Sequence, residues 1–445
     1  MAYDGANVGT IGNILKEYYM GPVNEQLNNE VLLLSRLEAR SEDLVGKRAY
    51  VPLHTGRSTG IGARGELDTL PAAGSQVYDK AVYDLKYLYG RIQVSGPSMA
   101  KSKSDAGAFL QILKGELDGV RNDLRKDLAR QVYGDGTGAI APLYQIVTSA
   151  TTSQTVVLDS LEPIRKGQLY VNMKIDVRNA DGTAYASGTG VTIASINPSD
   201  GAYGNRPSMV LTVSAAMGAD SAGSDRYITR AGASADVTYP SDANRLSNEV
   251  DGLQRIVSAS TTNSLGGISV TASSNTFWDN KRLVRGTDWS DSDPDVASSQ
   301  TGVSLDLVQK AMNLVRLEGA MPSIILTTLG IQRDFYSLLQ DQVRYTEPTQ
   351  FRAGFSVLEY AGMPLIADID APYGKMYILD ESTLKVFSDQ DFHFLDGDGN
   401  TLRQVPDKDA YEAVMVRYMN LGATKRSNQM VISGIQVDGA DDLGI

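Results

Sequence analysis

The sequence of 445 residues contains no cysteine and only two histidines, His54 and His393. The absence of cysteine excludes disulfides, thiolate metal sites and cysteine nucleophiles. Two histidines are too few for a zinc site built from three or four histidines of one chain. We therefore predict no catalytic residue, no metal site and no cofactor, and we expect both histidines to be ordinary loop or strand residues.

Long apolar runs are also missing. No apolar run is long enough to cross a membrane, and residues 1–30 lack the basic start and apolar core of a signal peptide. We therefore expect a soluble chain that is made in a cytoplasm and has no membrane partner. The formal net charge of -12 argues against a protein whose affinity comes from neutralising nucleic-acid phosphates, because such binding needs a basic surface.

What the sequence does contain is typical of a folded globular protein. Hydrophobic residues make up 42% and charged residues 21%, and a chain of this length suggests about two to four packed units. Ser, Thr, Ala and Gly dominate the middle third, which favours strands joined by tight turns there. We detect no internal repeat.

The first hundred residues predict a helical arm followed by a long hairpin. Apolar residues from Val23 to Leu37 recur at three- and four-residue steps, as in an amphipathic helix. Residues 49–53 predict a short strand, and the polar, glycine-rich residues 54–75 predict a long loop. The β-prone run 77–94 has the length needed to pair back along the first strand.

The clearest local signal is a long amphipathic helix over residues 105–133. Leucines and valines recur every three or four residues from Leu110 to Val132, with charged residues between them. At the usual rise per residue this helix would be roughly 40 Å long. The glycine-rich segment Gly134–Gly138 then predicts a helix stop and turn.

The remainder predicts a small β-domain and then an α+β unit. Several β-type runs separated by turn clusters lie within residues 144–240. Beyond them we expect helices at 304–317, where Ser304 is the predicted N-cap, and at 329–339. The expected strands of this part are 323–327, 357–360, 363–369, 375–379, 391–395, 411–420 and 429–435.

Three glycine-rich motifs resemble ligand sites, but their contexts argue against this reading. Gly60–Gly65 has the G-x-G-x-x-G spacing of a dinucleotide site, yet Pro71 and no helical period follow, so a loop tip is the better interpretation. Gly134–Gly138 lacks the Lys-Ser or Lys-Thr of a phosphate loop. Asp396–Asn400 copies the start of a calcium loop, but Thr401 stands where glycine is needed, so we expect a hairpin turn.

The order of these elements resembles the Hong Kong 97-type major capsid fold of tailed bacteriophages. In that family a helical N-arm, an extended E-loop and a long spine helix are followed by an axial domain. Leu128–Gly138 resembles the end of the spine helix, and Tyr360–Leu365 and Pro372–Tyr377 resemble axial-domain strands. The resemblance implies an α+β fold of this type that carries an inserted small β-domain.

The resemblance also implies a division of the chain. The N-arm would span residues 1–50 and the E-loop hairpin 51–94. The peripheral domain would comprise 95–143 and 391–445, with the spine helix at 105–133. The inserted β-domain would span 144–240 and the axial domain 241–390.

The implied function is a major capsid protein that assembles with copies of itself, as pentamers and hexamers, into an icosahedral or prolate shell. It is assembled in the host bacterial cytoplasm, resides in the virion capsid and encloses double-stranded DNA without sequence-specific binding. We expect a separate scaffolding protein, because no long charged helical segment precedes the arm, and also a portal protein and decoration proteins as partners. An encapsulin-type bacterial nanocompartment shell is the alternative, and a hydrolase or a β-rich adhesin is a more distant one.

The expected assembly residues are charged side chains of the E-loop: Arg57, Arg64, Glu66 and Asp68. We expect them to become ordered only when they lie across a neighbouring subunit. Family members that cross-link covalently use an E-loop lysine, but residues 54–79 contain none. We therefore expect a shell held by noncovalent overlap of the E-loop and N-arm, unless Lys80 at the base of the loop serves for cross-linking.

Overall fold

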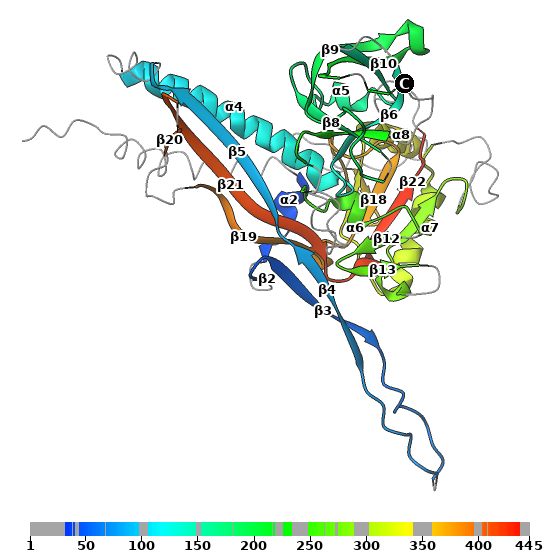
Figure 1. Cartoon of the computed structure of the whole chain (residues 1–445). Helices are drawn as coiled ribbons and strands as arrows, with labels where there is room; N and C mark the ends of the chain where they lie inside the picture. Colours follow the sequence, from blue (N-terminus) through cyan, green and yellow to red (C-terminus); the bar gives the residue numbers. More distant parts are fainter. Residues whose placement is uncertain are drawn as a thin grey trace, which may run out of the picture.

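The computed structural model describes residues 32–37, 39–40, 44–66, 68–97, 106–147, 153–179, 181–215, 217–218, 226–233, 248–261, 263–271, 275–288, 302–340, 358–395, 403–406 and 408–436. Their apolar side chains form three cores. The largest joins a long sheet, the long helix and one face of a second sheet. The second core lies between the other face of that sheet and two helices, and the third fills a β-barrel. Figure 1 shows the barrel and a long hairpin on opposite sides of the body.

A five-stranded sheet runs beside the helix α4 (Ala106–Tyr133), as Figure 1 shows. Alternate residues of β5 are buried, and Gly90 lies under the helix. A Cβ at Gly90 would come within 2.7 Å of Leu124 and 2.9 Å of Val120, so the glycine lets the helix approach the sheet closely. The strands of this sheet are β1 (Ala39–Arg40), β5 (Lys86–Ser95), β19 (Leu384–Phe394), β20 (Arg403–Gln404) and β21 (Ala410–Ala423).

The long hairpin is formed by β3 (Arg48–Gly56) and β4 (Val77–Asp84), with β2 (Leu44–Val45) at its edge. The prediction that the whole run 77–94 pairs back along the first strand is wrong. The run is two strands separated at Leu85, and β5 pairs with β21 from Ser95↔Ala410 to Lys86↔Met419. The partner of β5 depends on distant parts of the chain, because α4 covers the buried face of this strand. A local β pattern does not reveal such a contact.

A six-stranded sheet with helices on one face follows later in the chain. The predicted N-cap is confirmed, since Ser304 Oγ accepts a hydrogen bond from Leu307 N at the start of α7 (Leu305–Leu317). A second helix, α8 (Leu329–Gln340), packs on the same core. In order across the sheet, the strands are β14 (Lys281–Val284), β22 (Met430–Ser433), β18 (Lys375–Leu379), β15 (Ile324–Thr327), β17 (Met363–Ala367) and β16 (Leu358–Tyr360).

Two strands pair across the predicted limit between the axial and peripheral segments. The last strand, β22, lies between β14 and β18, so the segment 391–445 does not belong wholly with the long sheet. Conversely, β19 begins at Leu384 and pairs with β21, although residues 384–390 were assigned to the axial unit. The first half of β19 is buried on both faces, and such a strand lacks the alternation by which a strand is recognised.

Six antiparallel strands close into a barrel around the third core. The barrel begins at Ala139, five residues earlier than the predicted inserted domain, and the sequence reading missed β11. A short helix, α5 (Glu162–Arg165), and a 3-10 turn, η1 (Gly201–Tyr203), connect strands of this unit. In order around the barrel, the strands are β10 (Arg206–Thr212), β7 (Ser153–Leu158), β6 (Ala139–Val147), β11 (Arg226–Arg230), β8 (Lys174–Arg178) and β9 (Val191–Asp200).

Short elements complete the described chain. They are α2 (Leu32–Arg36), α6 (Leu253–Ile256), β12 (Asn263–Leu265), β13 (Ile268–Val270), η2 (Thr276–Trp278), η4 (Glu381–Thr383) and η5 (Arg426–Asn428). The first part of the predicted arm helix, up to residue 31, lies outside the described residues, as does the calcium-like motif at 396–400. None of the helices in the ranges given above is long and apolar enough to span a membrane.

Candidate assembly surface

The four predicted assembly residues lie in the segment between β3 and β4, and Figure 1 shows this segment extending away from the body. We call residues 57–78 the loop tip, and residues 48–53 with 81–84 the hairpin base. The strand register runs from Arg48↔Asp84 in the base to Gly56↔Val77 at the start of the tip. The hairpin base is bound to the rest of the chain, whereas most residues of the loop tip are exposed.

Tyr83 anchors the hairpin base in the largest core. Its hydroxyl donates to Ala423 O at 2.8 Å and accepts from Ala423 N at 3.1 Å, and its ring stacks on Phe387. Burial raises the pKa of Tyr83, so the phenol stays protonated. A Cβ at Gly422 would come within 2.6 Å of Phe387 and 2.7 Å of Tyr83, so only glycine leaves room for this pair of rings.

Glycines also shape the loop tip. The two chains continue side by side beyond the strands, where Ser58 Oγ donates to Gly74 O at 3.0 Å. A Cβ at Gly74 would lie 2.7 Å from the backbone nitrogen of Thr59, so a larger residue would push the chains apart. The motif Gly60–Gly65 is followed by irregular chain, not by a helix, in keeping with the loop-tip interpretation.

The structure places two of the predicted residues in one turn. Asp68 Oδ2 accepts from Gly65 N at 2.9 Å, and the Asp68 amide donates to Gly65 O at 3.2 Å. Arg64 Nε donates to Thr69 O and Arg64 Nη1 to Ala63 O, both at 3.1 Å. Arg64 and Asp68 therefore stabilise the shape of the tip and do not form an ion pair with each other.

Arg57 and Glu66 are exposed at the loop tip. Within the part of the chain that the structure describes, neither side chain makes a hydrogen bond or an ion pair. Their charges are therefore available to a partner. Lys80 lies in β4, where its ammonium is 5.5 Å from the centre of the Tyr50 ring, outside the loop tip.

The loop tip also exposes large apolar side chains, which were not among the predicted assembly residues. Ile61 and Leu70 are each 81% exposed, and Tyr78 is 69% exposed. Burial of such side chains against a partner would gain free energy, so they are candidates for a contact surface. The signal was present in the sequence, because Ile61 and Leu70 interrupt a segment that is otherwise rich in Gly, Ser, Thr and charged residues.

The two histidines do not form a site. His54 Nε2 lies 2.6 Å from Gln76 Oε1 on the hairpin, and His393 Nδ1 lies 3.0 Å from Asp391 O in β19. Over the described residues, no three His, Cys, Asp or Glu side chains gather as ligands for a metal ion.

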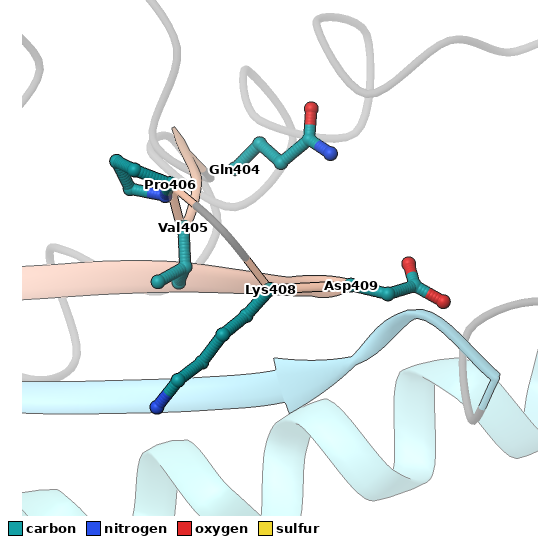
Figure 2. A pocket seen from close by; sticks show the side chains of 5 residues that line it. All are labelled: Gln404, Val405, Pro406, Lys408 and Asp409. Carbon is teal, nitrogen blue, oxygen red and sulfur yellow. The ribbon is translucent and has the colours of Figure 1, made fainter.

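A shallow pocket at the turn between β20 and β21 does not offer a binding site either. Figure 2 shows its side chains, which come from one short segment and point in different directions: Gln404, Val405, Pro406, Lys408 and Asp409. Acid–base catalysis and ligand specificity need groups that converge from separate elements. The turn instead fixes the end of the sheet, since Gly96 N donates to Asp409 O at 2.9 Å.

The most buried cation is part of the structural framework. Arg426 is fully buried, and its guanidinium donates to Ile256 O at 2.6 Å, to Arg255 O at 3.0 Å and to Asn263 Oδ1. Burial lowers the pKa of Arg426 to about 10, so the group stays charged at neutral pH. These bonds satisfy carbonyls at the end of α6, which is a structural use of the charge.

Comparison with known proteins adds to this geometry. No protein-family model matches the sequence, and no curated protein matches it. Among solved structures, a chain of the cyanophage A-1(L) capsid asymmetric unit matches with a TM-score of 0.50 at 12% sequence identity, over 93% of this chain and 92% of that chain. The chain has the phage capsid fold. The prediction of that fold is confirmed, whereas its division into named domains stays a prediction.

Two further matches are weaker. The capsid of a native GTA particle matches with a TM-score of 0.46 at 9% identity, over 91% of this chain and 89% of that chain. The holo-SrpI encapsulin complex from Synechococcus elongatus matches with a TM-score of 0.26 at 13% identity, over 32% of this chain and 52% of that chain. The loop tip is one of several places on the described chain where large apolar side chains are exposed, and Leu317 and Met321 lie at others.

Proposed function

We propose that this chain is the major capsid protein of a tailed double-stranded DNA phage. Copies of it form pentamers and hexamers that close into an icosahedral or prolate shell around the genome. The loop tip carries this proposal, because it holds exposed apolar side chains on a hairpin that extends away from the body. The match to the cyanophage A-1(L) capsid chain over nearly the whole length supports it.

The contact is proposed to be noncovalent overlap between neighbouring subunits. Ile61 and Leu70 supply apolar area, while Arg57 and Glu66 supply charges that restrict the orientation of the partner. A surface on one copy that binds a different surface on the next is a heterologous contact, and such contacts close into rings when the rotation fits. Each contact can be weak, because repetition in a closed shell makes later contacts effectively intramolecular.

The remaining partners belong to the same proposal. A separate scaffolding protein would guide assembly, a portal protein would occupy one vertex, and decoration proteins would bind the finished shell. The genome would be enclosed without sequence-specific contacts, in line with the net charge of -12. Assembly would take place in the host cytoplasm, and the final location would be the virion capsid.

Expression of the chain alone, followed by negative-stain electron microscopy, tests the proposal. Closed shells, tubes or free capsomers are the expected products. A chain that remains monomeric at high concentration contradicts a capsid role. The contents of particles purified from their native source distinguish the nanocompartment alternative, because a phage capsid packages DNA and an encapsulin-type shell packages an enzyme. The match to the encapsulin complex spans too little of the chain to support that alternative.

A further inference from the structure

The barrel is joined to the body at more than its two covalent connections. The chain enters the barrel from the last turn of α4, through the short turn that ends at Ala139. After leaving the barrel it returns to the same turn, where Val250 N donates to Gln131 Oε1 at 3.1 Å. Both connections therefore converge on one end of the long helix.

Charged groups reinforce this shared attachment. Asp127 of α4 lies 3.1 Å from Arg130 and 3.3 Å from Arg230, which is the last residue of the barrel strand β11. Arg130 also pairs with Glu249 at 2.6 Å in a buried position. Burial alone would raise the pKa of Asp127, but Arg130 and Arg230 hold it below its ordinary value, so the carboxylate stays ionised.

The third contact is made by Lys166, which follows the barrel helix α5. Its side chain is only 5% exposed, and its ammonium donates to Glu162 Oε1 at 2.6 Å and to Ala371 O at 2.9 Å. Ala371 is buried in the loop between β17 and β18 of the six-stranded sheet. A lysine buried on the barrel therefore bonds to the backbone of a separate sheet.

The same loop is also held from the side of the long helix. Tyr133, the last residue of α4, donates from its hydroxyl to Asp368 Oδ2 at 2.6 Å. At the end of the loop, Lys375 Nζ donates to Gln254 Oε1 at 2.9 Å, on α6. The long helix therefore contacts the barrel, the barrel contacts the loop between β17 and β18, and this loop contacts the end of the long helix.

We infer that the inserted barrel is an intramolecular brace, which fixes the end of the long helix relative to the six-stranded sheet through Lys166. A pendant domain would need only its two covalent connections. Lys166 instead gives up its hydration to bond with a carbonyl of another unit, and such charge-assisted bonds are directional. Removing the bond frees the 368–371 loop on its barrel side without touching the apolar interior of the barrel.

Hydrogen exchange of the unassembled full-length chain tests the brace. In Lys166→Met, the apolar stem is kept and the donor is lost. The amides of Asp370 and Ala371, which donate within their own loop, are expected to exchange about ten-fold faster, since a hydrogen bond to a charged group is worth about that factor. Exchange in β7 and β10 should not change. Arg165→Met is the matched control, because Arg165 is the exposed neighbour in α5.

Tyr133→Phe is a second variant that approaches the loop from the helix side. It removes the bond to Asp368, and it is expected to speed exchange in the same loop while sparing the barrel strands. The inference is overturned if Lys166→Met leaves the loop protected. It is also overturned if β7 and β10 lose protection as much as the loop does, because Lys166 would then only stabilise the barrel itself.

Particle size provides a readout that rests on the proposed function. If the brace fixes the angle between two units of each subunit, shells built from Lys166→Met should show a wider spread of diameters than wild-type shells. The two ideas can fail separately. If wild-type chains form no particles, the capsid proposal is contradicted, but the hydrogen-exchange result still tests the brace. If the exchange rates of the loop amides do not change in Lys166→Met, the brace is contradicted even when shells form.

Discussion

The hairpin base and the loop tip are parts of one β-hairpin, yet their side chains meet opposite surroundings. Tyr83 and Tyr78 are both tyrosines of β4, five positions apart. Tyr83 is 2% exposed and bonded to Ala423, whereas Tyr78 is 69% exposed. The base therefore stabilises the monomer, and we propose that the tip serves contacts that the monomer does not contain.

The largest expected effect separates these two tyrosines. Tyr83→Ala should lower the free energy of unfolding by about 3 to 5 kcal/mol, because it removes a buried aromatic ring and leaves a cavity beside Phe387. Tyr78→Ala should change it by less than about 0.5 kcal/mol. Urea unfolding followed by tryptophan fluorescence, from the buried Trp278 and from Trp289, measures both free-energy changes. Equal losses of unfolding free energy in the two variants would contradict the distinction between hairpin base and loop tip.

The second effect should appear only in assembly. The double variant Ile61→Asp and Leu70→Asp should lower the yield of shells at least about ten-fold, because each apolar side chain is worth about 1.5–3 kcal/mol when buried and the loss recurs in every subunit. The free energy of unfolding should stay within about 0.5 kcal/mol of the wild-type value. Thr69→Asp adds charge at the same tip without removing apolar area, and shells should still form from it.

A smaller effect is expected from Arg64→Glu. The substitution removes the bonds to Thr69 O and Ala63 O and reverses a charge at the tip, so the yield of shells should fall several-fold. The melting temperature should not change, because Arg64 contacts no core residue. Normal particles by sedimentation and electron microscopy would contradict a role for this charge.

The smallest effect concerns a contact between α2 and the body. Burial alone would raise the pKa of Glu381, but hydrogen bonds from Arg36 and Ser323 hold it below its ordinary value. A lowered folded pKa gives stability that is present above the ordinary glutamate pKa of about 4.3 and is lost as pH falls through the folded pKa. Arg36→Ala should therefore cost less than about 1 kcal/mol at pH 7, since the pair is partly exposed.

The pH dependence provides the check on this contact. The difference in unfolding free energy between the wild-type chain and Arg36→Ala should shrink toward zero as the pH falls through the lowered pKa of Glu381, because the carboxyl group is then protonated in both chains. If the difference in unfolding free energy is the same at pH 7 and at low pH, Arg36 acts through packing alone.

Much of the fold could be predicted because its signals are local. The periodicity of α4 and the cap at Ser304 depend on residues a few positions apart, and the strand at 375–379 matches β18. The partner of β5 could not be predicted, because a β-prone run does not specify which strand it joins. The pairing of β22 with β14 and β18, and of the first half of β19 with β21, could not be predicted for the same reason.

The exposed loop that holds the candidate site could be predicted, whereas the role of its residues stays a prediction. The loop was found from its glycines and its lack of periodicity, and its four charged residues lie at the exposed tip. Two of them, Arg64 and Asp68, are occupied in shaping the turn. The apolar residues Ile61 and Leu70 were passed over, because exposure depends on how far the hairpin extends from the body, which no local pattern shows.

The central claim is that the loop tip is exposed in the monomer and covered by another copy in the shell. Because the chain has no cysteine, Ile61→Cys provides a single attachment point for a polarity-sensitive fluorophore. Quenching of this label by iodide, measured before and after assembly, is the most direct test. The account predicts strong quenching in the unassembled chain and protection in the assembled particle. Particles whose label is quenched as strongly as in the free chain would contradict it.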